Sequence, residues 1–217
     1  MASAPPAPDL EALSAPEVLE HMVREYHPRL AVACSFQKEA SVIIDMLLRI
    51  EPDVRIFTLD TGVLFPETYE TWRRIEARYG IKVEVFRGEW IDGLWARDPD
   101  ACCGMRKVEP LERALAGVDG WITGLRREQS SLRATTPKLG WDIKHEKWKA
   151  APLADWTDKD VWRYIVEHDV PYNPLHDHGY ASIGCTHCTQ TGDGRDGRWA
   201  GSDKSECGLH ELQQPAA

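Results

Sequence analysis

A chain of 217 residues with a formal charge of −9, from 26 basic and 35 acidic side chains, has the size of a single domain. Its hydrophobic content of 42% is enough for a packed core and excludes a wholly disordered chain. The lack of any run of about 18 apolar residues excludes a membrane-spanning helix. The acidic balance argues against a general nucleic-acid-binding protein, but a small anionic substrate stays compatible with it if cations gather locally.

The two ends of the chain differ in composition from its centre. Residues 1–13 are rich in alanine and proline and lack the basic start and apolar stretch of a secretory signal. We therefore expect a disordered leader over 1–13, a disordered end over 213–217 and a cytoplasmic protein. In that compartment, paired cysteines serve as metal ligands or redox groups more often than as structural disulfides.

Helical and strand patterns alternate along most of the chain. Ser14, Pro16 and Glu17 form an N-cap, an N1 proline and a capping box, which predict a helix to about Tyr26. Further helices are expected after residues 35–39, over 66–79 and over 105–115, and strands over 30–34, 54–59, 81–86 and 121–123. Thr157 opens one more helix, which ends before residue 171.

This alternation predicts an α/β fold with a mostly parallel sheet flanked by helices. From residue 172 onward the chain holds glycine, histidine, cysteine and arginine in place of apolar repeats. We assign residues 14–182 to an α/β nucleotide-binding domain. Residues 183–217 are a C-terminal segment of the same domain that carries the reactive side chains.

Four of the six cysteines form two close pairs, Cys102 with Cys103 and Cys185 with Cys188. Four thiolates could hold one zinc ion or a 4Fe–4S cluster, and each pair could also be an unrelated buried or redox pair. Neighbouring cysteines diverge at Cβ, which suits a wide cluster better than one tetrahedral ion. The nearby histidines are interpreted as surface or hydrogen-bonded side chains, because four thiolates already complete a site.

The two remaining cysteines have different surroundings. Cys207 lies near the C-terminus and is left over from the pairs, as a nucleophile would be; the alternative is a free surface thiol. Cys34 ends an apolar strand and is expected in the core.

Three segments are expected to meet at the carboxyl edge of the sheet, where open α/β folds bind ligands. Residues 35–38 enter a helix whose N-terminal amides favour a phosphate. Residues 59–62 offer backbone groups and a carboxylate for a base or ribose, and residues 124–133 offer arginines for phosphate or sulfate. The candidate substrate-binding residues are Ser35, Leu59, Asp60, Thr61, Gly62, Gly124, Arg126 and Arg133.

Read together, these segments resemble the phosphosulfate-reductase branch of the adenine-nucleotide α-hydrolase-like (PP-loop type) fold. The matching segments are 35–39 (SFQKE), 59–62 (LDTG), 102–111 (CCGMRKVEPL), 124–133 (GLRREQSSLR), 152–161 (PLADWTDKDV), 172–189 (YNPLHDHGYASIGCTHCT), 195–199 (RDGRW) and 204–210 (KSECGLH). The two cysteine pairs and the ECGLH tail are most similar to the iron–sulfur adenylyl-sulfate (APS) reductases of sulfate assimilation. The resemblance favours a 4Fe–4S cluster over zinc.

The resemblance implies an activity and a set of roles. The thiolate of Cys207 attacks the sulfur of APS, AMP leaves, and thioredoxin (or glutaredoxin) reduces the S-sulfocysteine and releases sulfite. The residues that would surround the phosphosulfate are Lys107, Arg195, Arg198 and His210, with Arg133 helping. Cys102, Cys103, Cys185 and Cys188 would bind the cluster, which supports the site without carrying the electrons. The C-terminal segment would be a mobile lid, and the protein a homo-oligomer.

Two sequence features limit which substrate the resemblance implies. Residues 35–37 are not the glycine-rich SGGxDS loop of ATP-consuming relatives, which fits a substrate with one phosphate. Reductases restricted to the 3′-phosphorylated substrate (PAPS) lack the two cysteine pairs, so PAPS reduction or dual use is the second candidate. From another class, a zinc-binding structural or interaction module is the third. No nucleic-acid or membrane partner is expected.

Overall fold

The computed structural model describes residues 6, 8–210 and 214–215. Its centre is a seven-stranded sheet in the order β3-β2-β1-β4-β6-β5-β7. The strands are β1 (Leu30–Ala33), β2 (Arg55–Leu59), β3 (Glu84–Phe86), β4 (Gly120–Ile122), β5 (Leu139–Asp142), β6 (Lys147–Ala150) and β7 (Gln214–Pro215). Neighbours from β3 to β6 pair in parallel, and β5 pairs antiparallel with β6 and β7. The predicted mostly parallel α/β sheet is confirmed.

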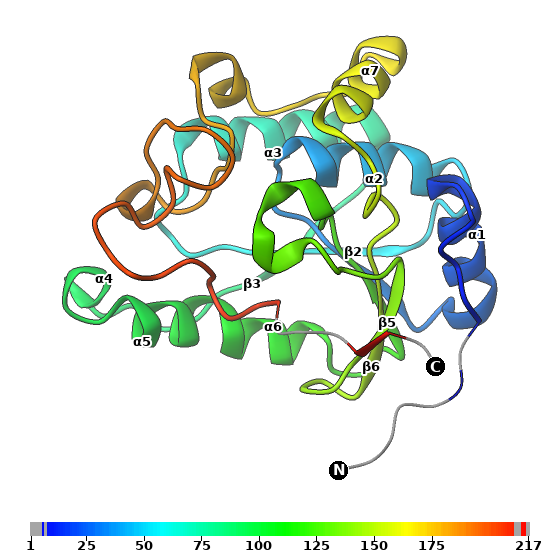
Figure 1. The fold of residues 1–217 in the computed structure, drawn as a ribbon, viewed down its shortest axis with the longest axis horizontal. Helices are drawn as coiled ribbons and strands as arrows, with labels where there is room; N and C mark the ends of the chain where they lie inside the picture. The colour runs from blue at the N-terminus through cyan, green and yellow to red at the C-terminus, as the bar shows by residue number, and fades with distance from the viewer. Residues whose placement is uncertain (1–5, 7, 211–213, 216–217) are drawn as a thin grey trace.

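Helices cover both faces of this sheet (Figure 1). The longer ones are α1 (Ala15–Tyr26), α2 (Lys38–Leu48), α3 (Pro66–Tyr79) and α7 (Asp158–His168). On the opposite face, α4 (Leu94–Arg97), α5 (Pro99–Cys103), the π-helix η1 (Gly104–Val108) and α6 (Glu109–Ala114) follow one another. Short 3₁₀ helices are η2 (Arg127–Gln129), η3 (Ser131–Arg133), η4 (Pro174–His178) and η5 (Thr186–Cys188). Among the described residues, no helix is long and apolar enough to cross a membrane.

Alternating strand residues divide the core into two layers. Val32 and Ile122 pack into the larger cluster with α1, α2 and α7. Their neighbours Ala31 and Trp121 point to the other face, where they meet Leu111 of α6. This two-residue period is what a strand buried on both faces requires.

The N-terminal signals of two helices work as the sequence predicts. At α1, the Ser14 amide donates to Glu17 Oε2 at 2.7 Å. At α7, the Asp160 amide donates to Thr157 Oγ1 at 3.2 Å. Helix α3 has the predicted bounds, and Gly80 ends it in a left-handed conformation at φ 66°.

Two predicted elements have other bounds in the structure, and one observed element was not predicted. The helix expected over 105–115 begins six residues earlier at Pro99 and contains the π-helix at its centre. The hairpin of β5 and β6 was not predicted, because its buried positions include the polar side chains of Asp142 and Lys149. The strand expected over 81–86 is short and covers 84–86.

Part of the leader expected to be disordered, the described residues 8–13, contacts the rest of the domain. Leu10 is buried in the larger core cluster. The Glu11 carboxylate accepts hydrogen bonds from the Lys138 amide at 2.9 Å and from Arg127 Nη2 at 2.6 Å. At the other end, residues 214–215 pair with β5, whereas residues 1–5, 7, 211–213 and 216–217 lie outside the described part of the chain.

Candidate active site

A cavity opens at the carboxyl edge of the sheet, where β1 has β2 on one side and β4 on the other. The strand order reverses at β1, because the chain continues to β2 on one side and later to β4 on the other. Open α/β sheets bind ligands at such a reversal. The cavity is lined by ten of the residues expected to react with or bind substrate: Ser35, Leu59, Thr61, Lys107, Gly124, Arg133, Arg195, Arg198, Cys207 and His210. Within the described chain, the expected substrate-binding residues Asp60, Gly62 and Arg126 are not part of its wall.

The turn that follows β4 packs tightly against the start of α2, which follows the turn after β1. Phe36 adopts a left-handed conformation at φ 57° and its buried ring stacks on Trp72, with 5.2 Å between ring centroids. A Cβ on Gly124 would lie 2.9 Å from Glu39 Cβ, so only glycine allows this approach. The two turns therefore hold Ser35 and Gly124 at one side of the cavity.

Asp60 shapes its loop and does not face the cavity. Its carboxylate accepts hydrogen bonds from the Gly62 amide at 2.9 Å, Tyr69 Oη at 2.7 Å and Arg87 Nε at 2.9 Å. Burial raises the pKa of Asp60, but these hydrogen bonds outweigh it and hold the pKa below its ordinary value. The neighbouring Thr61 lines the cavity, and its Oγ1 lies 3.3 Å from Cys185 Sγ.

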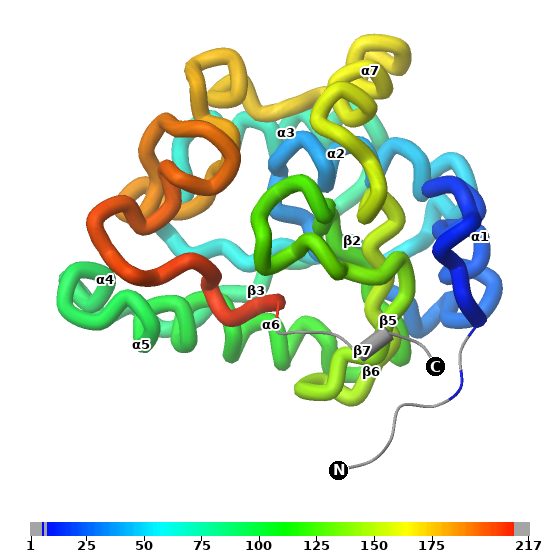
Figure 2. The backbone as a smooth tube through the Cα atoms, viewed as in Figure 1, coloured from blue at the N-terminus to red at the C-terminus, as the bar shows by residue number. Residues whose placement is uncertain are grey.

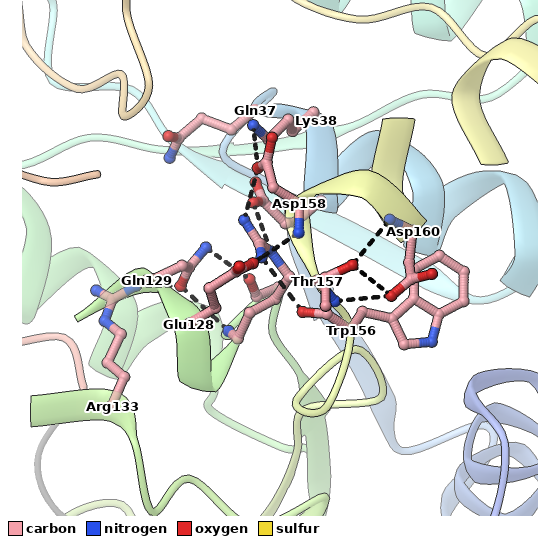
Figure 3. A network of polar contacts seen from close by, with 12 residues as sticks. Gln37, Lys38, Glu128, Gln129, Arg133, Trp156, Thr157, Asp158 and Asp160 are labelled. Carbon is pink, nitrogen blue, oxygen red and sulfur yellow. Dashed lines mark hydrogen bonds and ion pairs between the residues drawn. The ribbon is translucent and has the colours of Figure 1, made fainter. Parts of the chain in front are cut away.

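Arg126 is enclosed by carboxylates instead of facing a substrate. Its guanidinium contacts Glu39 at 3.0 Å, Glu128 at 2.8 Å and Asp158 at 3.0 Å. The network in Figure 3 continues to Gln129, whose Oε1 accepts from the Arg126 amide and from Arg133 Nη1. Arg126 thus joins α2, η2 and α7, and an arginine with three carboxylate partners has no free fork for a substrate anion.

The side chain of Arg133 does face the cavity, together with two arginines of the C-terminal segment. Arg133 and Arg195 both bind the carboxylate of Glu206. Burial, reinforced by Arg133, lowers the pKa of Arg195 to about 10. Arg198 Nη1 donates to Ser182 Oγ at 3.2 Å, and its Nε is buried without a hydrogen-bond partner among the described residues.

Lys107 stands between this cavity and a second one. It lies in the π-helix η1, a type of helical distortion found often at functional sites, and it lines both cavities. Burial alone would lower the pKa of Lys107, but Cys185 and Cys207 more than offset it and raise the pKa. One cation therefore faces both the predicted nucleophile and the cysteine pairs.

The second cavity collects all four paired cysteines. Cys102 and Cys103 reach it from α5, and Cys185 and Cys188 from the ends of η5. None of the four forms a disulfide. In the described part of the chain, no three His, Cys, Asp or Glu side chains are arranged to hold a single metal ion. Burial raises the pKa of Cys185, yet Lys107, Thr61 and Arg198 outweigh it and lower the pKa.

The predicted nucleophile lines the cavity at the sheet edge from the C-terminal segment. Cys207 is buried and packs against Cys103 and Trp199. His210 stacks on Trp121 of β4 at 6.1 Å between ring centroids, and burial followed by Lys149 lowers its pKa well below the ordinary value. Figure 2 shows the red part of this segment passing along α5 toward α6. The expected mobility of the segment stays a prediction.

Sequence reasoning missed two residues that shape the site. Gln129 lines the cavity and holds Arg133 through its side-chain oxygen at 2.6 Å. Lys149 lies on β6 with its Nζ 4.7 Å from the centre of the Trp121 ring, and burial lowers its pKa to about 8. The sequence offered no signal for Lys149, because lysine is rarely buried and the strand KWKA alternates lysine with tryptophan and alanine.

Comparison with known proteins identifies the family. Residues 29–191 match the model of the phosphoadenosine phosphosulfate reductase domain. The chain belongs to this family. An adenosine 5′-phosphosulfate reductase of Lysinibacillus sphaericus is 46% identical over 209 residues, which cover 90% of each chain. One from Bacillus subtilis is 45% identical over 208 residues and 89% of each chain. The family expected from the motifs is confirmed.

Solved structures agree with this assignment. The phosphoadenylyl-sulfate (PAPS) reductase of Candida auris, a phosphate complex, superposes with a TM-score of 0.75 at 33% identity. The match covers 83% of this chain and 92% of that one. The FMN adenylyltransferase of Candida glabrata shares only the fold, with a TM-score of 0.63 at 11% identity. The expected PP-loop type of fold is confirmed.

Proposed function

We propose that this family member is an adenylyl-sulfate reductase of assimilatory sulfate reduction, acting in the cytoplasm. The observation that carries the proposal is the position of Cys207, which lines one cavity together with Lys107, Arg195 and Arg198. A thiol aimed at a small cationic cavity suits attack on an anionic sulfur centre. The names of the 42–46% identical relatives support APS as the substrate.

In the first step, the thiolate of Cys207 attacks the sulfur of APS. A sulfur–sulfur bond forms while the bond from that sulfur to the bridging oxygen breaks, and AMP leaves with the electron pair. Lys107, Arg195 and Arg198 neutralise the charge that gathers on the leaving phosphate and on the sulfonate. Ser35, Leu59 and Gly124, at the ends of β1, β2 and β4, would hold the adenosine.

The second step needs a separate dithiol protein, for which we propose thioredoxin or glutaredoxin. Its thiolate attacks Cys207 Sγ, sulfite leaves, and a mixed disulfide forms. The second thiol of the partner then breaks that disulfide, so the dithiol supplies both electrons and Cys207 returns as a thiolate. The lid motion that would expose Cys207 to this partner and a homo-oligomeric state are part of the same proposal.

The four paired cysteines fit a 4Fe–4S cluster. Their thiols line one cavity, and four cysteine thiolates are the ligand set of such clusters. Arg106 and Lys107 line the same cavity and would offset the negative charge of the thiolates. The cluster would supply a fixed local charge beside Lys107 instead of electrons. Lys107 itself would contact the substrate from the other cavity.

The cluster assignment predicts different results for two cysteines. Cys185→Ala should abolish bound iron and the brown colour of protein purified without oxygen, and with them activity. Cys34→Ala, which changes a buried thiol outside the four-cysteine cavity, should keep iron at the wild-type level. Iron and sulfide analysis with the visible spectrum measures both. A colourless, zinc-loaded wild-type protein would contradict the proposal.

PAPS reduction is the second candidate, because the superposed Candida auris enzyme is named for that substrate. The two substrates differ by a 3′-phosphate, so kcat/KM measured with each separates the alternatives. We expect APS to be preferred, because the resemblance links the paired cysteines to APS reductases. A larger kcat/KM for PAPS would reverse this assignment.

The nucleophile is tested without any reductant. Mixing the wild-type protein with APS alone should leave a sulfonate on Cys207, read by peptide mass spectrometry, and one equivalent of AMP. Cys207→Ser should keep the iron but form neither product, and it should make no sulfite when thioredoxin is added. Cys34, a buried thiol that lines the same cavity, is the internal control and should carry no sulfonate. Turnover by the serine variant would exclude the mechanism.

A further inference from the structure

The residue before the nucleophile holds two arginines of the substrate cavity. Glu206 Oε1 accepts from Arg133 Nε at 2.8 Å, and Oε2 accepts from Arg133 Nη2 at 2.8 Å and from Arg195 Nη2 at 3.0 Å. The side chains are 10%, 13% and 18% exposed for Arg133, Arg195 and Glu206. This is a forked pair with a third charge-assisted bond, in a place largely shielded from water.

The same two arginines line the cavity in which the substrate anion has to lie. A guanidinium fork binds a carboxylate and a phosphate or sulfate through the same pair of parallel bonds. A carboxylate on both arginines is therefore in direct competition with an anion of the substrate. The proposed mechanism gives Glu206 no role. Its carboxylate nevertheless resembles the substrate in being an anion that binds Arg133 and Arg195.

We propose that Glu206 is a positioning residue that substitutes for the substrate anion while the cavity is empty. It keeps Arg133 and Arg195 oriented and draws the tail that carries Cys207 over the cavity. When the phosphosulfate enters, it takes over one or both arginines, and the carboxylate leaves them. This inference rests on the proposed function for the identity of the anion, and on the three hydrogen bonds for the exchange.

The exchange predicts that removing the charge of Glu206 strengthens substrate binding. If the carboxylate occupies the arginines in nine molecules of ten, the apparent Kd is about tenfold larger than that of the free site. Glu206→Gln keeps the size of the side chain but loses the charge. We expect it to lower the Kd of APS by up to about tenfold, and to loosen the tail in the absence of ligand.

Two measurements on the full-length, iron-containing protein test this. The Kd of APS is measured by calorimetry without oxygen in a Cys207→Ser background, which prevents sulfonation, with and without Glu206→Gln. The docking of the tail is measured in protein that keeps Cys207, as the rate of its alkylation by iodoacetamide read by peptide mass spectrometry. Glu206→Gln should lower the Kd and raise the alkylation rate several-fold.

Two control variants separate the exchange from simpler effects. Asp100→Asn removes the ion pair between α5 and Lys204 of the tail but keeps the Glu206 carboxylate, so it should raise the alkylation rate and lower the Kd by less than Glu206→Gln does. Asp203→Asn removes an exposed charge of the same tail and should change neither quantity.

An unchanged or larger Kd for Glu206→Gln would overturn the inference. An equal fall in Kd for Asp203→Asn would also overturn it, because general charge would then explain the effect. Failure of the proposed function gives a different result. In that case APS neither binds the Cys207→Ser protein nor sulfonates the wild type.

Discussion

At the scale of single residues, the position of Arg198 depends on the absence of a side chain at Gly184. A Cβ built on Gly184 would lie 2.3 Å from Arg198 Nη2 and 2.6 Å from its Cζ. The guanidinium is the far end of a flexible side chain, so it can move aside while the backbone stays in place. Gly184→Ala is therefore expected to displace a cation that lines the cavity without unfolding the protein.

The expected result of Gly184→Ala is a loss of about tenfold in kcat/KM for APS, with a melting temperature close to the wild type. A displaced charge-assisted contact corresponds to about 1.5 kcal/mol or more of lost stabilisation. A double-mutant cycle with Arg198→Ala checks the cause, since neighbours that act together are not additive. Once Arg198 is absent, Gly184→Ala should cost nothing further. Additive losses would show that the alanine acts elsewhere.

Sequence motifs correctly predicted which reactive side chains line the cavity. They did not predict which way the polar side chains of Asp60 and Arg126 point. Cys207, Lys107 and Arg198 were placed by motif and do line one cavity. Asp60 and Arg126 belong to equally good motifs, yet both turn away to bind neighbouring polar groups. Which way such a side chain turns depends on partners distant in sequence, such as Arg87 and Glu39, and a local pattern contains no information about them.

At the scale of elements, the junction of α2, η2 and α7 depends on one buried arginine. The side chains of Arg126 and Glu39 are 5% and 7% exposed. Removing one partner of a buried ion pair leaves the other charge without compensation, which costs about 3–5 kcal/mol. Arg126→Met is thus expected to lower the free energy of unfolding by about 3 kcal/mol.

This prediction distinguishes a structural arginine from a substrate-binding one. The stability of Arg126→Met is measured by urea unfolding under anaerobic conditions, and its KM for APS is compared with that of Arg133→Met. We expect the stability loss to dominate in Arg126→Met and the rise in KM to dominate in Arg133→Met. A large rise in KM with unchanged stability at position 126 would restore the role that the sequence first indicated.

Elements with strong end signals were predictable, and elements with polar interiors were not. Helix α3 begins at Pro66 and ends before Gly80 as expected, because proline and glycine act through the local backbone. The π-helix that presents Lys107 has no such signal, since it differs from an α-helix only by its hydrogen-bond spacing. The β5–β6 hairpin was not predicted, because its buried residue Lys149 is polar and is buried by tertiary contacts.

At the scale of the whole molecule, an acidic protein concentrates cations at one edge of its sheet. The net charge is −9, yet four cations line the substrate cavity: Lys107, Arg133, Arg195 and Arg198. They come from η1, η3 and the C-terminal segment, so the fold must bring together residues almost 100 positions apart. The overall fold and the location of this edge followed from strand order and family motifs. The contacts between the N-terminal segment and the loop beside this edge did not follow from either.

The N-terminal segment is the clearest case, because it is tied to the loop that presents Arg133. Glu11 binds Arg127 and the Lys138 amide, and Lys138 Nζ donates to the carbonyl oxygens of Glu11 and Leu13 at 3.0 Å and 2.6 Å. Both anchors flank the stretch from residue 127 to residue 138. Loss of the segment should therefore loosen this stretch and increase the cost of ordering Arg133 around an anion.

Two deletions test this long-range role. Removing residues 2–7 should leave the melting temperature and the KM for APS unchanged, because the described anchors begin beyond them. Removing residues 2–13 should lower the melting temperature by several degrees and raise the KM several-fold, with kcat much less affected. The larger deletion also removes buried Leu10, so Glu11→Gln is the finer variant: it weakens the contacts to Arg127 and the Lys138 amide but keeps the core. A rise in KM for Glu11→Gln with an unchanged melting temperature would show that the N-terminal segment orders the arginine loop and does more than complete the core.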